Sequence, residues 1–167
     1  MRIRKVKITK YNQIHMVYEA GPSNGDEYQF TCRDQAKPEF YEALAAMAEH
    51  VIDMCELPDG YLDRIKVRGV SFSYGGESET MGATISAVME LEESYQALNL
   101  VTPHKASAMY CPDTPDDEKQ LLTGDCIDAL EALLVECERY IQGERAQGSL
   151  FPEMPAQEAV TEPAQLN

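Results

Sequence analysis

Residues 13–32 have the sequence QIHMVYEAGPSNGDEYQFTC, and this stretch decides how the fold begins. Its two ends, QIHMVYEA and DEYQFTC, have the composition of short strands. The cluster GPSNGD between them is rich in residues that favour tight turns and tolerate positive φ. The stretch therefore predicts a β-hairpin, and the preceding segment RIRKVKITKY, residues 2–11, predicts a third strand.

A helical pattern follows the hairpin. Pro38 is suited to the first position of a helix, and apolar residues then recur at spacings of three and four, as they do on one buried helical face: Phe40, Leu44, Met47, Val51 and Met54. The turn sequence LPDG at residues 57–60 ends the pattern. We predict a helix over residues 38–56.

The second half of the chain repeats this plan. Three more strands are predicted in DRIKVRGVSFSY (63–74), TMGATISAVMELEE (80–93) and YQALNLVT (95–102). A second helix is predicted over residues 116–142, with Thr114 as its N-cap and Pro115 at its first position. Its apolar stripe is formed by Cys126, Leu130, Leu133, Cys137 and either Tyr140 or Ile141.

These elements predict an α+β fold, in which two strand-strand-strand-helix units form one antiparallel sheet with the helices packed on one face. The expected domain covers residues 1–145, and the proline-containing segment 146–167 is expected to be a flexible tail. The segments RIRKVKITKY and RIKVRGVSFSY both begin Arg-Ile, add further bases and end in Tyr. This similarity favours pseudo-repeats at 1–60 and 61–145, and a plain α+β domain without duplication is the alternative.

Composition indicates a globular protein, with 44% hydrophobic and 26% charged residues. No apolar run approaches the roughly 20 residues that span a bilayer, and the N-terminus lacks the apolar stretch of a signal peptide. We therefore expect a cytoplasmic protein without a membrane partner. The five cysteines include no C-x-x-C pair, which argues against a disulfide framework and a zinc ribbon and favours free, buried thiols.

The sequence contains no catalytic signature. Each of the three histidines, His15, His50 and His104, stands without a second His or a carboxylate at metal-ligand spacing. A Gly-rich phosphate loop and a nucleophile elbow are also missing from the sequence. We expect a protein that is not an enzyme and that holds no metal or cofactor.

The net charge of −15 is unevenly distributed. The first strand and the strand after residue 63 combine cations with aromatic rings, as single-stranded DNA binders do when they neutralise phosphates and stack on bases. The candidate residues are Arg2, Arg4, Lys5, Lys7, Lys10, Tyr11, Arg64, Lys66, Arg68, Phe72 and Tyr74. In the first strand Ile3 is out of phase with Val6 and Ile8 unless a bulge intervenes. The competing interpretation is a solvated face whose cations protect a sheet edge.

Acidic residues concentrate near the second helix. Residues 113–145 contain ten acids: Asp113, Asp116, Asp117, Glu118, Asp125, Asp128, Glu131, Glu136, Glu138 and Glu144. Regularly spaced carboxylates can imitate DNA phosphates, so an acidic DNA mimic or an inhibitor that binds a host protein is the alternative function. A solvated helix face is the simpler interpretation.

The pentapeptide QGSLF at residues 147–151 resembles the Gln-x-x-Leu-Phe peptide by which bacterial and phage replication and repair proteins bind the bacterial sliding clamp. The matching positions are Gln147, Leu150 and Phe151, whereas Gly148 stands where the motif prefers a larger residue. The resemblance implies that Gln147 would hydrogen-bond at the rim of a clamp pocket and that Leu150 and Phe151 would bury in it. The alternative is that Leu150 and Phe151 latch onto the core.

The order of elements is similar to the plan of Whirly-type single-stranded DNA binders, in which a repeated sheet-then-helix unit supports nucleic acid. Together with the clamp-like peptide, this looks like an accessory protein of a phage or mobile element. The working hypothesis is a non-enzymatic replication or recombination accessory protein that binds single-stranded DNA weakly and docks on the clamp. The sheet edges also make a homodimer a reasonable expectation.

Overall fold

The computed structural model describes residues 1–146, so the peptide Gln147–Phe151 and the segment after it lie outside the described residues. The strands are β1 (Arg2–Ile8), β2 (Ile14–Ala20), β3 (Asp26–Cys32), β4 (Ile65–Gly75), β5 (Thr80–Met89), β6 (Leu98–Val101) and β7 (Lys105–Ala106). The α-helices are α1 (Pro38–Ala45), α2 (Ala48–Met54) and α3 (Gly124–Ile141), and two 3₁₀ turns cover Pro22–Asn24 and Asp59–Arg64.

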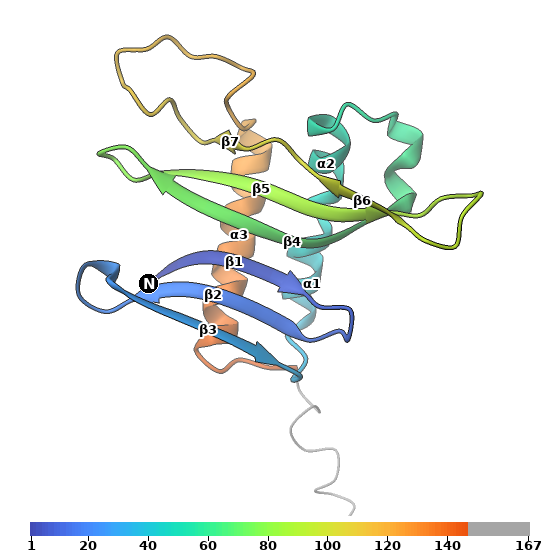
Figure 1. Cartoon of the computed structure of the whole chain (residues 1–167). Helices are drawn as coiled ribbons and strands as arrows, with labels where there is room; N and C mark the ends of the chain where they lie inside the picture. The colour runs from blue at the N-terminus through green and yellow to red at the C-terminus, as the bar shows by residue number, and fades with distance from the viewer. Residues whose placement is uncertain (147–167) are drawn as a thin grey trace, which may run out of the picture.

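The strands form one antiparallel sheet in the order β3-β2-β1-β4-β5-β6, and the short β7 pairs with β5 (Figure 1). Each half of the chain contributes a three-stranded meander, and the first strands of the two halves, β1 and β4, lie side by side at the centre. The predicted α+β class and antiparallel sheet are confirmed. The arrangement is the one that two pseudo-repeats would produce, although duplication itself stays a prediction.

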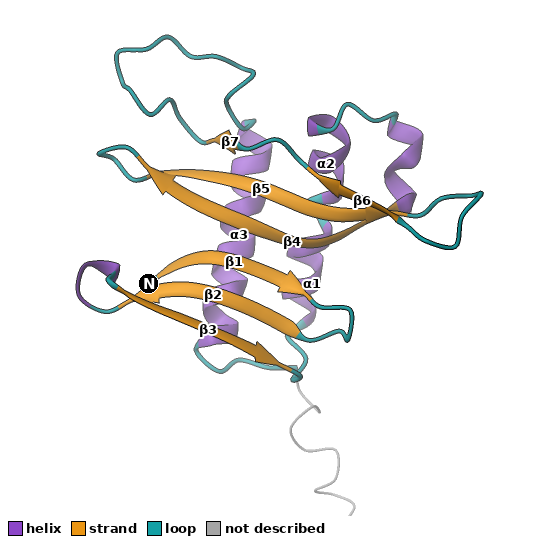
Figure 2. Ribbon diagram, viewed as in Figure 1, coloured by secondary structure: helices purple, strands orange, loops and turns teal. Residues whose placement is uncertain are grey.

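The helices cover one face of this sheet, and the other face is open (Figure 2). Val6, Met16, Val70 and Ile85 point to the helices and are at most 1% exposed. α3 packs against both halves, because its residues Leu130, Leu133, Cys137 and Tyr140 belong to the same core cluster as these strand residues. One hydrophobic core therefore joins the two halves.

Tyr140 holds the C-terminal end of α3 in this core. Its ring stacks on Phe30 with centroids 6.1 Å apart and packs at a tilt against Phe40, also at 6.1 Å. Its hydroxyl donates a hydrogen bond to the carbonyl of Asp34. These contacts tie the end of α3 to β3, α1 and the segment between them.

A bulge on β1 explains the irregular phase of its apolar residues. The register with β2 shifts between Ile3 and Lys5, so that Arg4 is the additional residue. Ile3 and Val6 consequently both face the core, at 1% and 0% exposure. The condition stated from the sequence, a bulge between these positions, is met.

The start of the last helix differs from the prediction. α3 begins at Gly124, and the hydroxyl of Thr123 caps it by accepting a hydrogen bond from the N–H of Cys126 at 3.2 Å. The predicted first turn after Thr114 is instead a loop that returns to the sheet, because Ala106 exchanges backbone hydrogen bonds with Gln120 and Leu122. The prediction of Thr114 as the cap and Pro115 as the first helical residue was wrong. A helix that began there would need the carbonyl of Gln120 and the N–H of Leu122 for its own hydrogen bonds, and both groups are bonded to Ala106 instead.

The first predicted helix is also interrupted. α1 ends at Ala45 and α2 begins at Ala48, with a turn at Ala46 and Met47. Met47 nevertheless remains fully buried, so the apolar stripe continues across the break. Of the five free cysteines, Cys126 and Cys137 are buried as predicted, Cys32 and Cys55 are half-buried, and Cys111 is exposed.

The seam between β1 and β4 requires a glycine. A Cβ on Gly69 would lie 2.6 Å from Cβ of Lys7 and would also collide with the carbonyl oxygen of Val6. We expect Gly69→Ala to lower the free energy of unfolding by about 1–3 kcal/mol, because the central strands must separate. Urea unfolding measures the change. Gly60→Ala is the control, since a Cβ at Gly60 meets nothing within 4 Å; equal effects of the two substitutions would contradict the proposed role of Gly69.

The two threonines distinguish the observed helix start from the predicted one. Thr123→Ala removes the N-cap of α3 and is expected to cost about 1 kcal/mol of stability. Thr114→Ala is expected to stay within about 0.5 kcal/mol of the parent, because it caps no helix. Thermal and urea unfolding of both variants tests the assignment, and a larger loss for Thr114→Ala would show that the helix starts earlier.

Candidate nucleic-acid interface

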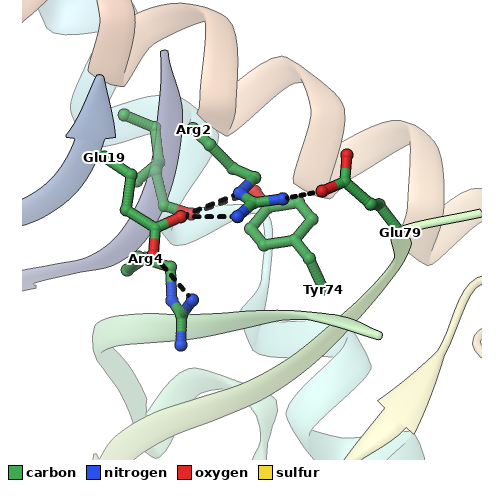
Figure 3. Close-up of polar contacts among 6 residues, drawn as sticks. Arg2, Arg4, Glu19, Tyr74 and Glu79 are labelled. Carbon is green, nitrogen blue, oxygen red and sulfur yellow. Dashed lines mark hydrogen bonds and ion pairs between the residues drawn. The ribbon is translucent and has the colours of Figure 1, made fainter. Parts of the chain in front are cut away.

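Two of the predicted cations, Arg2 and Arg4, are neutralised within the protein. Arg2 lies between two carboxylates, with Nη2 at 2.8 Å from Oε2 of Glu19 and Nη1 at 2.6 Å from Oε1 of Glu79 (Figure 3). Arg4 Nη1 lies 3.0 Å from the other oxygen of Glu19. This end of the sheet therefore offers little free positive charge to a phosphate.

Tyr74 belongs to the same group of residues. Its ring lies beneath the guanidinium of Arg2, with Cζ 4.9 Å from the ring centroid, and its hydroxyl donates to the carbonyl of Ile3 at 2.9 Å (Figure 3). Burial raises the pKa of this hydroxyl, and the nearby charges modify it. Tyr74 thus connects β4 to β1, and its ring face is occupied by Arg2.

Two further candidates, Phe72 and Arg64, already make contacts within the protein that leave them unavailable to a nucleic acid. Phe72 is only 4% exposed and faces the core, so it has no ring surface for a base and we remove it from the candidate set. Its position follows from strand alternation, because Val70 and Phe72 lie on the face that the helices cover. Arg64 forms an ion pair with Glu92 and covers the ring of Tyr61 at 4.8 Å.

The remaining cations of this region have no carboxylate partner. Within residues 1–146, no ion pair involves any member of a set that we name the cation cluster: Lys5, Lys7, Lys10, Arg33, Lys66 and Arg68. The chain has 14 Lys and Arg residues, and only Lys105 and Lys119 besides this cluster are similarly unpaired among the described residues. The unpaired positive charge is therefore concentrated rather than scattered.

Antiparallel topology is the reason for this concentration. The end of β1, the start of β2, the end of β3 and the start of β4 all meet at one end of the sheet (Figure 1). Lys10 follows β1, Arg33 follows β3, and Lys66 and Arg68 lie in the first residues of β4. Lys7 is opposite Gly69 in the register of β1 and β4, which places it next to Arg68 in the sheet.

A cleft of about 320 Å³ opens at this end of the sheet. It forms because β1 ends at Ile8, whereas the first residues of β4 continue past it and pair only with β5. Lys66 and Arg68 line the cleft, with Tyr41 and Leu44 of α1 on its inner wall. The register between β4 and β5 shifts at Arg68, and such bulges redirect a side chain out of the regular alternation.

A wider hollow of about 600 Å³ adjoins the cleft, and the two share Asn12 and Gln35. Tyr11 and Arg33 line this hollow. Tyr11 is 71% exposed, and Nζ of Lys10 lies 5.0 Å from its ring centroid. The residues that line the cleft and the hollow include no Asp or Glu, and amide side chains lie between the cations.

The pKa of His15 is affected by the nearby cations, because His15 is paired with Lys7 across β1 and β2. Burial, followed by the nearby charges of Lys7 and Lys5, lowers the pKa of this imidazole below its ordinary value. The ring is held by a hydrogen bond between Nδ1 and the hydroxyl of Thr31 at 2.9 Å. Two members of the cation cluster, Lys7 and Lys5, thus act on this imidazole in a chain whose net charge is −15.

Sequence reasoning placed five of the six cluster cations in the candidate set and missed Arg33. The missing signal was positional, because Arg33 directly follows the third predicted strand and antiparallel pairing brings that strand end back to the first turn. Asn12, Gln35 and Tyr41 were also missed, since their role depends on the cleft rather than on any motif. Gln147, Leu150 and Phe151 lie outside the described residues.

Other kinds of site find less support in the described part of the chain. Residues 1–146 contain no group of three or more His, Cys, Asp or Glu side chains arranged to hold a metal ion. No helix in the same range has both the length and the apolar character needed to cross a bilayer. The chain matches no protein-family model, no curated protein and no solved structure. Functional assignment therefore depends on the geometry of the site.

Glu19 provides a test of the neutralised end of the sheet. The hydrogen bond from Arg2 holds the pKa of Glu19 below its ordinary value of 4.5, so its stabilising effect is present above that pH and is lost as the pH falls further. We expect Glu19→Gln to lower the melting temperature at neutral pH and to match the parent in strong acid. Glu118→Gln, an exposed carboxylate without an ion pair to any described residue, is the control, and a Glu19→Gln deficit that persists in acid would contradict the ion-pair explanation.

Proposed function

We propose that the protein is a non-enzymatic DNA replication or recombination accessory protein of the phage or mobile-element type, and that it binds single-stranded DNA weakly through the cation cluster. The supporting observation is that, in a chain of net charge −15, six cations at this end of the sheet form no ion pair with any described residue, and three of them, Lys66, Arg68 and Arg33, line the cleft or the hollow beside it. Phosphate binding releases condensed counterions and supplies affinity without sequence preference. An uncompensated cationic cleft is suited to that role.

The shape of the site favours a single strand over a duplex. Duplex readers usually insert a helix or ribbon into a groove, whereas most of the cluster lies on strand ends and turns beside an open hollow of about 600 Å³. Tyr11 offers an exposed ring on which a base can stack, and stacking on one aromatic ring contributes about 1–3 kcal/mol. The amides of Asn12 and Gln35 can donate to base or phosphate oxygens.

This proposal revises the predicted residue set. Lys5, Lys7, Lys10, Tyr11, Lys66 and Arg68 are retained, and Arg33 is added. Arg2, Arg4 and Arg64 are set aside because carboxylates already neutralise them, and Phe72 and Tyr74 because their rings are buried or covered.

A charge-removal experiment tests the cleft. Binding of a fluorescein-labelled oligothymidylate is measured by anisotropy over a range of salt concentrations for the native chain and for Lys66→Ala plus Arg68→Ala. We expect the double variant to bind about 10-fold more weakly at low salt, and the slope of log K against log salt to become shallower by about 1.4, because two phosphate contacts are lost.

The matched control is Lys105→Ala plus Lys119→Ala, which removes two cations that form no ion pair with a described residue and that line neither the cleft nor the hollow. It is expected to retain the native slope. Absence of oligonucleotide binding by the native chain at low salt would reject the proposal, and equal weakening by both double variants would show that only total charge matters.

Clamp docking through residues 147–151 is the second part of the proposal. The N–H of Ala146, the last described residue, donates to the carbonyl of Gln35 at 2.9 Å, and Gln35 lines the cleft. A partner bound to the residues that follow would therefore be tethered at the same end of the molecule as the cation cluster. This geometry is favourable for a protein that meets DNA while held on a clamp.

A pull-down with bacterial sliding clamp tests this part. We expect Leu150→Ala plus Phe151→Ala to abolish capture without changing the melting temperature, because the pair would bury in the clamp pocket. Met154→Ala plus Val160→Ala, which removes apolar side chains outside the pentapeptide, is expected to be captured normally. Undiminished capture of the first variant would refute docking, and a large loss of its stability would identify a core latch.

One observation favours the alternative function. Asp125, Asp128 and Glu131 are exposed on the outer side of α3 and form no ion pair with any described residue. A row of free carboxylates could occupy a cationic nucleic-acid site on a host protein. This acidic mimic or inhibitor becomes the favoured function if the native chain binds no oligonucleotide.

A further inference from the structure

A separate cavity of about 320 Å³ lies where α2, β7 and the N-terminal end of α3 meet. These three elements are neighbours in the upper part of Figure 1. The cavity shares no lining residue with the cleft at the cation cluster. Its size is at the lower end of the range of about 300–1,000 Å³ that is typical of small-molecule pockets.

His50 is the decisive residue of this cavity. It is only 6% exposed, yet its ring forms no hydrogen bond with any residue of the described chain. The nearest carboxylate oxygen, Oε1 of Glu49, lies 3.6 Å from Nε2, which is too long for a hydrogen bond. Its ring nitrogens therefore remain available to a ligand in the cavity that His50 lines, one as a donor and one as an acceptor when the imidazole is neutral.

Two opposite charges complete the polar part of the lining. Lys105 and Asp53 both border the cavity, and neither forms an ion pair with the other or with any described residue. Both act on the thiol of Cys126, since burial raises its pKa to about 11, Asp53 adds to this effect and Lys105 opposes it. The cavity thus holds one cation and one anion around a thiol that stays protonated at neutral pH.

The rest of the wall is apolar. Met54, Leu121 and Leu122 line the cavity together with Cys126. The hydroxyl of Thr123 accepts a hydrogen bond from the N–H of Cys126 and retains its own proton for donation to a ligand. An occupant therefore needs a small apolar group and two opposite charges.

We propose that this cavity binds a small zwitterion with an apolar side chain, the chemistry of an aliphatic α-amino acid. Asp53 binds its ammonium group and Lys105 its carboxylate, His50 supplies a hydrogen bond, and the alkyl group packs on Met54, Leu121 and Leu122. The inference does not depend on nucleic-acid binding, because the two sites share no residue.

Three probes with a common branched alkyl end test the assignment by isothermal titration calorimetry on the full chain: L-leucine, 4-methylpentanoate and 3-methylbutylamine. Leucine carries both charges, and each of the others carries one. We expect leucine to bind, and each half-ligand to bind at least about 10-fold more weakly, because one charge-assisted hydrogen bond is missing. Absence of leucine binding, or a half-ligand that binds as tightly as leucine, would overturn the proposal.

Charge-removing variants distinguish the two polar contacts. Lys105→Met is expected to weaken leucine about 10-fold while leaving binding of the amine unchanged, and Asp53→Asn is expected to weaken leucine and spare the carboxylate. Lys119→Met, which removes an unpaired cation outside the cavity, is expected to bind leucine normally. Variants that lose affinity for all three probes equally would contradict the assigned contacts.

Discussion

The fold depends on the short pairing between β1 and β4. Three registered pairs, Lys5 with Ser71, Val6 with Val70 and Lys7 with Gly69, join two three-stranded meanders into one sheet. The strands can approach because Gly69 has no side chain where the backbone of Val6 and the stem of Lys7 pass. Once the meanders share a plane, one face serves both halves, and α3 can bury Leu130 and Tyr140 in a single core. Because the pairing is short, the first residues of β4 pair with β5 but not with β1, and the cleft occupies the space beyond Ile8.

The same topology separates the charges. At one end of the sheet, Glu19 forms ion pairs with Arg2 and Arg4, and Glu79 forms one with Arg2, so these positive charges are neutralised. At the other end, antiparallel order assembles strand ends whose cations, Lys7, Lys10, Arg33, Lys66 and Arg68, form no ion pair with any described residue. A chain with a net charge of −15 can therefore present a local positive region, because the field near a surface depends on the closest charges more than on the total. Burial lowers the pKa of His15 most, and the charges of Lys7 and Lys5 lower it further.

Much of the fold was predictable because its signals are local. The turn cluster GPSNGD, the alternation of the strands and the helical stripe through Cys126 and Leu130 each depend on residues close in sequence, and the structure confirms them. Predictions failed where distant pairing overrode local preference. The acidic, proline-led segment after Thr114 has the composition of a helix start, yet its backbone is held by Ala106 at the sheet, and Thr123 caps the helix instead. The prediction of Phe72 as a stacking ring failed for a related reason. The sequence of a strand does not show which face of the sheet the helices will cover, and Phe72 lies on the covered face.

The sequence by itself determined the α+β class, the approximate positions of the longer strands and of the helical segments, and a set of cations that could meet a phosphate. Only the tertiary structure decided which of those cations remain unpaired, because the partners of Arg2 lie 17 and 77 residues away and are chosen by strand register. It likewise decided that His50, one of three isolated histidines in the sequence, lines a cavity with Asp53 and Lys105 and has no hydrogen-bond partner within residues 1–146. The sequence specifies the chemical groups of the side chains, whereas the distances between the groups of a site are set only when distant segments pack together.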